Sequence, residues 1–230
     1  MPDYKSIYNQ HASQYDLMVS REDYQNNISG ALQHIAPLEN RDVIELGAGT
    51  GRLTMLLAPL ARSLRAFDVS GHMLQVAVTK LQAAGWSQVQ TGVADHRSLP
   101  APDRSADIVI SGWSVCYMVV DYPSTWEQEL GRALGEMKRV LRPGGTLIIL
   151  ETLGTGFESP TPPDSLKPYY AYLEKEGFAS TWMRTDYRFE SLDEAVTLAR
   201  FFFGDGLAQK VLDQNWVILP ECTGLWWLRV

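Results

Sequence analysis

The sequence predicts an α/β fold in which helices cover a mostly parallel sheet. Short apolar runs alternate with segments of helical period from residue 42 onward, and this alternation is typical of such folds. The first run ends at Leu46 and continues through a turn with three glycines, Gly47, Gly49 and Gly51, into an amphipathic segment. Glycine adopts positive φ and lets a ligand approach the backbone. The succession of strand, Gly-rich turn and helix therefore indicates a site for a nucleotide-like ligand.

Length and composition favour one globular domain over residues 1–230. A chain of 230 residues can bury one sizeable core but is short for two. The hydrophobic fraction of 45% and the charged fraction of 20% are those of an ordinary globular protein. Apolar runs stay well below the roughly 20 residues that cross a bilayer, and the N-terminus lacks the pattern of a secretory signal. We therefore expect no membrane partner and a cytoplasmic location.

Charge and cysteine content narrow the possible partners. A formal charge of −7 argues against nucleic acid, because Lys and Arg supply most of the affinity for phosphates. Cys116 and Cys222 lack any metal-ligand or redox spacing, and we expect both to be buried free thiols. His96 has no second ligand at a suitable spacing, so no metal site is expected. The protein is expected to be a monomer or a homodimer.

The predicted core, residues 41–151, contains short strands bounded by turn residues. We expect the strands at 42–46, 63–68, 89–93, 106–111 and 146–151, and helices at 51–61, 71–84 and 125–141. The third helix opens with a capping-box pattern at 124–127. It ends at Pro143-Gly144-Gly145, where the glycines allow a purely structural turn.

Segments on either side of this core complete the predicted domain. Residues 1–40, with several tyrosines and a helical pattern, predict an N-terminal helical cap. Residues 152–178 are rich in Pro and Tyr and predict an insertion or lid beside the carboxyl ends of the strands. The C-terminal part, 179–230, predicts a strand at 180–189 and a helix opened by a capping box at 191–194. A last strand is expected at 216–230, interrupted near Pro220.

Ligands of an open parallel sheet bind outside the carboxyl ends of its strands. Asp68 closes the second predicted strand, and its carboxylate can accept hydrogen bonds from vicinal ribose hydroxyls. Its alternative role is an N-cap, although Ser70 is available for that. Asp95 and His96 follow the third strand, where the alternative for Asp95 is an Asx hydrogen bond within a turn.

The glycine spacing distinguishes between possible ligands. A dinucleotide fingerprint would need glycine at position 52, where the chain has Arg52. The pattern Glu45-x-Gly47-x-Gly49-x-Gly51 instead resembles motif I of the class I S-adenosylmethionine (SAM)-dependent methyltransferases. Further segments at 68–74, 94–100, 106–118 and 142–147 resemble later parts of that family's pattern, in the same order. The resemblance covers about residues 42–151.

This resemblance implies a Rossmann-like fold: a seven-stranded, mostly parallel sheet with helices on both faces and an antiparallel last strand. It also implies SAM as cofactor, with ribose at Asp68, adenine near Met73 and Asp95, and the methionine part near Ser111. Core packing is the alternative for Met73. The segment 8–16 is similar to the Tyr-Asp opening of small-molecule members, which implicates Tyr15. The implied cofactor-binding residues are Tyr15, Glu45, Gly47, Ala48, Gly49, Asp68, Val69, Met73, Asp95, His96 and Ser111.

The implied reaction is in-line displacement of a methyl group from a sulfonium, which requires positioning more than a catalytic side chain. His11 is a candidate base, with a surface histidine as the alternative. Glu151 is another candidate, with a hydrogen bond to a neighbouring loop as the alternative. Tyr8, Trp113 and Tyr117 are expected to line the substrate pocket, unless the last two pack in the core. Their aromatic character favours a small, flat or partly apolar acceptor.

Two other functions remain open from the sequence. The first is a catalytically silent SAM-binding protein or scaffold, because the motifs contain no diagnostic catalytic residue. The second is a nucleotide-dependent oxidoreductase, which Arg52 and the separate Asp95 signal disfavour.

Overall fold

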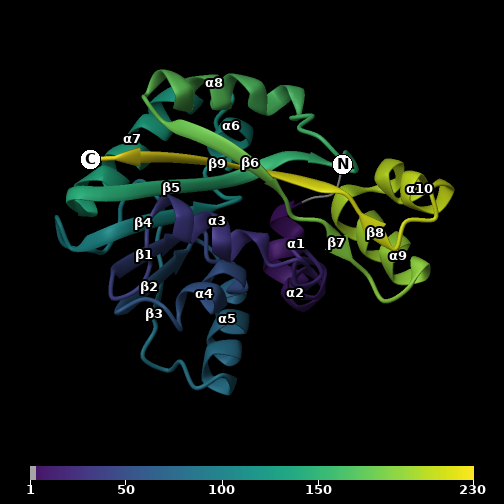
Figure 1. The fold of residues 1–230 in the computed structure, drawn as a ribbon, viewed down its shortest axis with the longest axis horizontal. Coiled ribbons are helices and arrows are strands. Elements are labelled where there is room, and N and C mark those ends of the chain that lie inside the picture. Colours follow the sequence, from purple (N-terminus) through teal and green to yellow (C-terminus); the bar gives the residue numbers. More distant parts are fainter. Residues whose placement is uncertain (1–3) are drawn as a thin grey trace.

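The computed structural model describes residues 4–230 and has a seven-stranded sheet at its centre (Figure 1). The strand order is β3-β2-β1-β4-β5-β9-β6. The strands are β1 (Asp42–Leu46), β2 (Ser63–Asp68), β3 (Gln90–Val93), β4 (Ala106–Gly112), β5 (Leu141–Thr155), β6 (Ala179–Arg184) and β9 (Glu221–Arg229). Strands β1 to β5 pair in parallel, and β9 is antiparallel to both of its neighbours. The Rossmann-like sheet predicted from the sequence is confirmed.

Both faces of the sheet are apolar, and this is why the strands have nearly continuous hydrophobic sequences. Side chains alternate along a strand: Ile44 and Leu46 of β1 belong to one core cluster, whereas Val43 belongs to the other. In β4, Val109 joins the first cluster and Ile110 the second. Each cluster therefore needs its own layer of helices.

The two helical layers lie on opposite faces of the sheet (Figure 1). One layer contains α3 (Asn27–Ile35), α4 (Arg52–Leu57) and α5 (Gly71–Ala83). The other contains α6 (Tyr117–Asp121), α7 (Trp126–Val140), the 3₁₀ turn η1 (Asp164–Leu166) and α8 (Lys167–Lys175). Helices on both faces were expected, and no helix within residues 4–230 has the length and apolarity needed to cross a bilayer.

Helix capping follows the sequence at one predicted site and departs from it at another. Ser191 accepts a hydrogen bond from the backbone N–H of Glu194 at 3.1 Å, as its capping-box pattern predicts. The pattern at 124–127 does not form, because Thr125 is the N-cap and its side chain makes no capping hydrogen bond. Elsewhere, the first core helix is shorter than predicted and ends at Leu57.

The Pro/Tyr-rich segment packs on the sheet. After β5 it forms η1 and α8, and Tyr169 and Tyr170 of α8 lie in the core cluster with Trp226. The ring centroids of Tyr170 and Trp226 are 4.6 Å apart, in a stacked arrangement. These aromatic side chains therefore contribute to the core of the sheet rather than to its carboxyl edge.

A small module beside the main sheet was not predicted. The chain from 180 to 189 forms β6 and then β7 (Tyr187–Arg188), which pairs with β8 (Ile218–Leu219) in a separate two-stranded sheet. Between them, α9 (Leu192–Phe203) and α10 (Asp205–Asp213) enclose a third core cluster. The break between β6 and β7 coincides with Asp186, which accepts hydrogen bonds from Arg184 and from the backbone N–H of Glu221.

The N-terminal cap consists of α1 (Tyr4–Gln10), α2 (Ala12–Ser20) and α3. Helices α1 and α2 lie between the main sheet and the added module (Figure 1), and Met18 of α2 joins the core of that module. Residues 1–3, which belong to the predicted cap, lie outside the described part of the chain. The cap therefore contacts parts of the chain that are distant in sequence.

Candidate functional site

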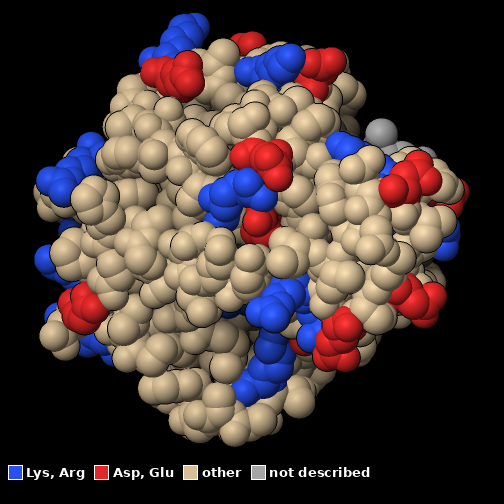
Figure 2. Space-filling view, turned by 45° about the vertical axis from the view of Figure 1, so that its right-hand side comes forward, with Lys and Arg blue, Asp and Glu red and all other residues tan. Residues whose placement is uncertain are grey.

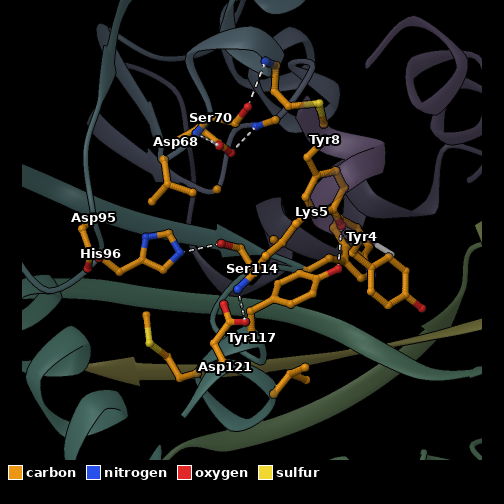
Figure 3. Close-up of a pocket in the computed structure, with 18 of the residues that line it drawn as sticks. Tyr4, Lys5, Tyr8, Asp68, Ser70, Asp95, His96, Ser114, Tyr117 and Asp121 are labelled. Carbon is orange, nitrogen blue, oxygen red and sulfur yellow. Dashed lines mark hydrogen bonds and ion pairs between the residues drawn. The ribbon is translucent and has the colours of Figure 1, made fainter. Parts of the chain in front are cut away.

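A cavity of about 500 Å³ lies at the carboxyl ends of β1, β2 and β4 (Figure 3). This is where an open parallel sheet binds its ligands. Residues from α1, α2 and the loop leading into α6 close the cavity on its other side. Its lining residues are Tyr4, Lys5, Tyr8, Tyr15, Gly47, Gly49, Asp68, Val69, Ser70, Met73, Asp95, His96, Arg97, Gly112, Trp113, Ser114, Tyr117, Met118, Val120, Asp121 and Tyr122.

The Gly-rich turn forms one wall of the cavity. Gly47, Gly49 and Gly51 have φ values of +70°, +54° and +86°, in the left-handed region that glycine adopts without strain. A Cβ atom at position 47 would lie 2.1 Å from the Oγ atom of Ser114. Gly47 is therefore required by both the backbone conformation and the close approach of Ser114.

Asp68 connects this turn to the end of β2. Its two carboxylate oxygens accept hydrogen bonds from the backbone N–H groups of Gly49 and Ser70, each at 2.8 Å. Burial raises the pKa of Asp68, and the two N–H donors oppose that shift. Since a carboxylate can accept about four hydrogen bonds, lone pairs remain for a ligand. The alternative N-cap role belongs to Ser70, whose Oγ atom accepts from Met73.

Asp95 lines the cavity but is strongly engaged by Arg97. The Arg97 side chain donates to both carboxylate oxygens, at 2.8 and 2.6 Å, and holds the pKa of Asp95 at about 2. The backbone N–H of Arg97 also donates to Asp95, which is the turn interaction considered as the alternative role. Arg97 in turn contacts Glu129 at 2.6 Å. Its positive charge is therefore shared by two carboxylates.

His96 and Ser114 form a pair at the base of the cavity (Figure 3). The Nε2 atom of His96 lies 2.5 Å from the Oγ atom of Ser114. Burial lowers the pKa of His96 to about 4, so its ring is neutral near pH 7. Its Nδ1 atom is buried and has no hydrogen-bond partner in the described part of the chain.

Three residues expected at the cofactor do not line the cavity. Ser111 lies inside β4 with no exposed surface, since it is paired with both β1 and β5. Glu45 is buried in β1, which raises its pKa to about 7, and its Oε2 atom has no hydrogen-bond partner among residues 4–230. Ala48 packs in a small cluster of buried side chains. Ser114, which sequence reasoning missed, is the serine that reaches the cavity after β4.

Arg52, which stands where a dinucleotide fingerprint would have its third glycine, contacts Trp113 in a wall of the cavity. The guanidinium carbon of Arg52 lies 3.4 Å from the ring centroid of Trp113, a cation–π arrangement. Arg52 also forms an ion pair with Glu22, whose side chain is 3% exposed. Trp113 lines the cavity, with φ +49°. Arg52 therefore links the N-terminal cap to a wall of the cavity.

Tyrosines from distant segments meet at the cap side of the cavity. The hydroxyl oxygens of Tyr8 and Tyr117 lie 2.5 Å apart. Tyr15 packs edge-on against Tyr8 with ring centroids 5.4 Å apart, and burial raises its pKa to about 12. Tyr4, also missed from the sequence, packs against Tyr117. The periodicity of such short helices gave no signal that these rings would converge.

The two candidate bases lie outside the cavity lining. His11 is exposed at the start of α2, with its ring centroid 6.1 Å from that of Phe201. Glu151 is fully buried in β5. Its Oε1 atom accepts hydrogen bonds from the backbone N–H of Cys116 at 3.0 Å and from the hydroxyl of Tyr169 at 3.2 Å. The contact with Cys116 is the loop interaction considered as its alternative role.

In the described part of the chain, the cysteines form no disulfide and no group of side chains is arranged as a metal site. Cys116 and Cys222 are both free, as predicted, but only Cys222 is fully buried. Over residues 4–230, no three His, Cys, Asp or Glu side chains are grouped so that they could hold a metal ion.

Comparisons with known proteins agree with this arrangement. Residues 44–149 match the family described as "Methyltransferase domain". A curated C-methyltransferase of ubiquinone/menaquinone biosynthesis from Hahella chejuensis is 33% identical over 135 residues, covering 56% of this chain and 48% of that protein. A malonyl-[acyl-carrier protein] O-methyltransferase from the same organism is 38% identical over 113 residues, covering 47% of this chain and 35% of that protein.

These curated relatives are longer than the matched region, so the chain spans about half of their length or less. Among solved structures, the YcgJ protein of Bacillus subtilis has a TM-score of 0.62 at 15% identity. The alignment covers 89% of this chain and 98% of that one, and it supports the fold. Residues 44–149 therefore match the methyltransferase-domain family, and the fold of the chain matches that of a solved structure.

Proposed function

We propose that this protein binds SAM in the cavity and transfers its methyl group to a small-molecule acceptor. The observation that carries the proposal is the single cavity of about 500 Å³ that joins the Gly-rich turn and Asp68 to a group of tyrosines. A methyl donor and its acceptor must occupy adjoining spaces, since the reacting atoms have to meet in line.

The residues present fit the cofactor. Asp68 retains lone pairs for the two ribose hydroxyls, and Asp95 and the backbone at His96 are available to adenine. Gly47 also lines the cavity, and we assign its backbone to the methionine part. We assign to Ser114 the role that the sequence suggested for Ser111, because Ser114 reaches the cavity.

When bound, SAM would supply an electrophilic methyl group, so the protein mainly positions the acceptor and excludes water. The cavity residues are suited to this role rather than to proton abstraction near pH 7. His96 is a weak base with a pKa of about 4, and its Nε2 atom is engaged by Ser114. Burial raises the pKa of both Tyr8 and Tyr117, so their hydroxyls stay protonated.

The acceptor is proposed as a small molecule because the space beside the cofactor residues is lined by aromatic rings. The two relatives described above differ in acceptor, one acting in quinone biosynthesis and the other on a malonyl carrier protein. At these identities they support methyl transfer without choosing between acceptors. The face in Figure 2 carries Lys and Arg next to Asp and Glu rather than a continuous basic surface. Exclusion of nucleic acid, the cytoplasmic location and the oligomeric state remain predictions from the sequence.

Calorimetry followed by a methyl-transfer assay tests the proposal. S-adenosylhomocysteine should bind and NAD should not, whereas the reverse would favour an oxidoreductase. Protein with SAM should then add one methyl group to members of a panel of phenols, quinols, amines, thiols and carboxylates, detected by mass spectrometry. Binding of S-adenosylhomocysteine without transfer to any acceptor would instead favour the silent SAM-binding protein.

A further inference from the structure

The acceptor end of the cavity holds a pair of tyrosine hydroxyls contributed by different segments. Tyr8 comes from α1 and Tyr117 from the first position of α6, and their oxygens are 2.5 Å apart (Figure 3). Both residues line the cavity. Because they are 109 residues apart in the chain, the pair exists only when the N-terminal cap lies over the carboxyl edge of the sheet.

The hydrogen-bonding capacity of this pair is only partly used. Two hydroxyls carry two protons, and the bond between the oxygens uses one of them. In the described part of the chain, neither hydroxyl makes another hydrogen bond. The second proton is therefore available to a ligand in the cavity.

The charges around the cavity argue against an acceptor that enters already ionised as a carboxylate. Arg97 is ion-paired with Asp95 at 2.6 Å and with Glu129 at 2.6 Å. Lys5 is ion-paired with Asp121 at 2.9 Å. A carboxylate entering the cavity would meet cations that are already compensated, and it would lose its hydration without an equivalent gain.

The walls near the pair are apolar or aromatic. Tyr4 packs against Tyr117 with ring centroids 6.0 Å apart, and Met118 and Val120 line the same part of the cavity. Flat ligands pack well between such surfaces. The structure thus combines an aromatic space, an available hydroxyl donor and compensated charges.

We propose that Tyr8 and Tyr117 form the subsite for an oxygen of the acceptor, and that the acceptor is a hydroxylated aromatic molecule rather than a carboxylate. This inference rests on the proposed function and specifies its acceptor. The hydroxyl pair donates a hydrogen bond to the acceptor oxygen, which stabilises the oxyanion more than the neutral form.

This subsite promotes the reaction without a protein base. The phenolic proton passes to water, and the oxyanion is held by the tyrosine hydroxyls. An electron pair of the oxygen forms the bond to the methyl carbon. The electrons of the breaking methyl–sulfur bond stay on sulfur. Tyr8 and Tyr117 are thus expected to act as positioning donors and to remain protonated.

Three probes of similar shape test the subsite: 4-nitrophenol, nitrobenzene and 4-nitrobenzoate. Protein loaded with S-adenosylhomocysteine should bind 4-nitrophenol more tightly than the other two. The visible absorbance of the bound phenolate should persist to lower pH than in free solution. Tyr8→Phe and Tyr117→Phe should each weaken 4-nitrophenol binding by about 10-fold or more, the usual loss for a hydrogen bond to a charged group. Nitrobenzene binding should not change.

Tyr172→Phe is the matched control, because Tyr172 of α8 packs against Trp126 of α7 and does not line the cavity. It should leave all three probes unaffected. The subsite is overturned if 4-nitrobenzoate binds as well as 4-nitrophenol, or if the Tyr8 and Tyr117 variants weaken nitrobenzene equally. Calorimetry with S-adenosylhomocysteine separates the two proposals. Loss of that binding counts against the proposed function, whereas intact binding with no discrimination among the probes counts only against the subsite.

Discussion

Replacement of Asp68 by Ala tests the cofactor assignment at its most specific point. The carboxylate is placed to hold two ribose hydroxyls while it also accepts the backbone N–H groups of Gly49 and Ser70, both at 2.8 Å. Hydrogen bonds to a charged group contribute about 1.5–3 kcal/mol. We therefore expect Asp68→Ala to weaken S-adenosylhomocysteine binding by about 10- to 150-fold.

The same substitution also removes the anchor of the Gly-rich turn. The two N–H groups lie at the cavity, where water can replace the lost carboxylate, so we expect a stability loss of only about 1–2 kcal/mol. Asp68→Asn should be no milder, because its amide would place a donor opposite one of these backbone donors.

Isothermal titration calorimetry and urea denaturation measure the two effects separately. Asp103→Ala is a suitable control, because the Asp103 side chain is 72% exposed and pairs with Arg139 on the surface. If Asp68→Ala left the affinity for S-adenosylhomocysteine unchanged while the protein stayed folded, the ribose assignment would be refuted.

Three further predictions follow from the packing. Gly47→Ala should reduce stability by about 1–2 kcal/mol through its left-handed φ alone. It should also weaken S-adenosylhomocysteine binding, because the added methyl group collides with Ser114. Adding Ser114→Gly removes this collision. In the double variant, calorimetry should therefore show recovered binding, while urea denaturation should still show the stability loss caused by the left-handed φ. Arg52→Met should lower the free energy of unfolding by about 3–5 kcal/mol, because Glu22 is left buried without its cation. In urea denaturation Glu22→Gln should recover part of that loss, and no recovery would contradict the ion-pair argument. Burial raises the pKa of Glu151 from 4.5 to about 7, so the folded state holds this proton more tightly than the unfolded state. The associated stability is present below about pH 4.5 and is lost as pH rises through about 7. As the pH rises from 4 to 8, the free energy of unfolding of Glu151→Gln should therefore increase by ~3 kcal/mol relative to that of the wild type. If urea denaturation gave parallel curves of unfolding free energy against pH for the two proteins, the buried proton would be contradicted.

The first strand of the central sheet and its Gly-rich turn could be predicted because neighbouring residues alone determine them. The apolar run before Gly47 and the positive φ that glycine permits are properties of neighbouring residues. The position of Asp68 was predictable for the same reason, since it is the last residue of a strand. Strand boundaries were less certain, and β5 extends from Leu141 to Thr155 beyond the predicted 146–151.

The two-stranded sheet of the added module could not be predicted from local sequence patterns. The run 180–189 is compatible with one strand, yet the side chain of Asp186 bonds to the backbone of Glu221 and redirects the chain into a second sheet. A contact between residues 35 positions apart leaves no periodic signal in either segment.

The sequence by itself determined that this chain has a Rossmann-like core with a Gly-rich turn and acidic residues at the ends of neighbouring strands. Only the tertiary structure decided that Ser114 rather than Ser111 faces Gly47, and that Tyr8 meets Tyr117. In the tertiary structure, neither His11 nor Glu151 lines the cavity. The physical reason is that the turn and strand ends are set by backbone preferences of adjacent residues. The acceptor space, in contrast, is formed by side chains that come together only when the cap packs over the sheet.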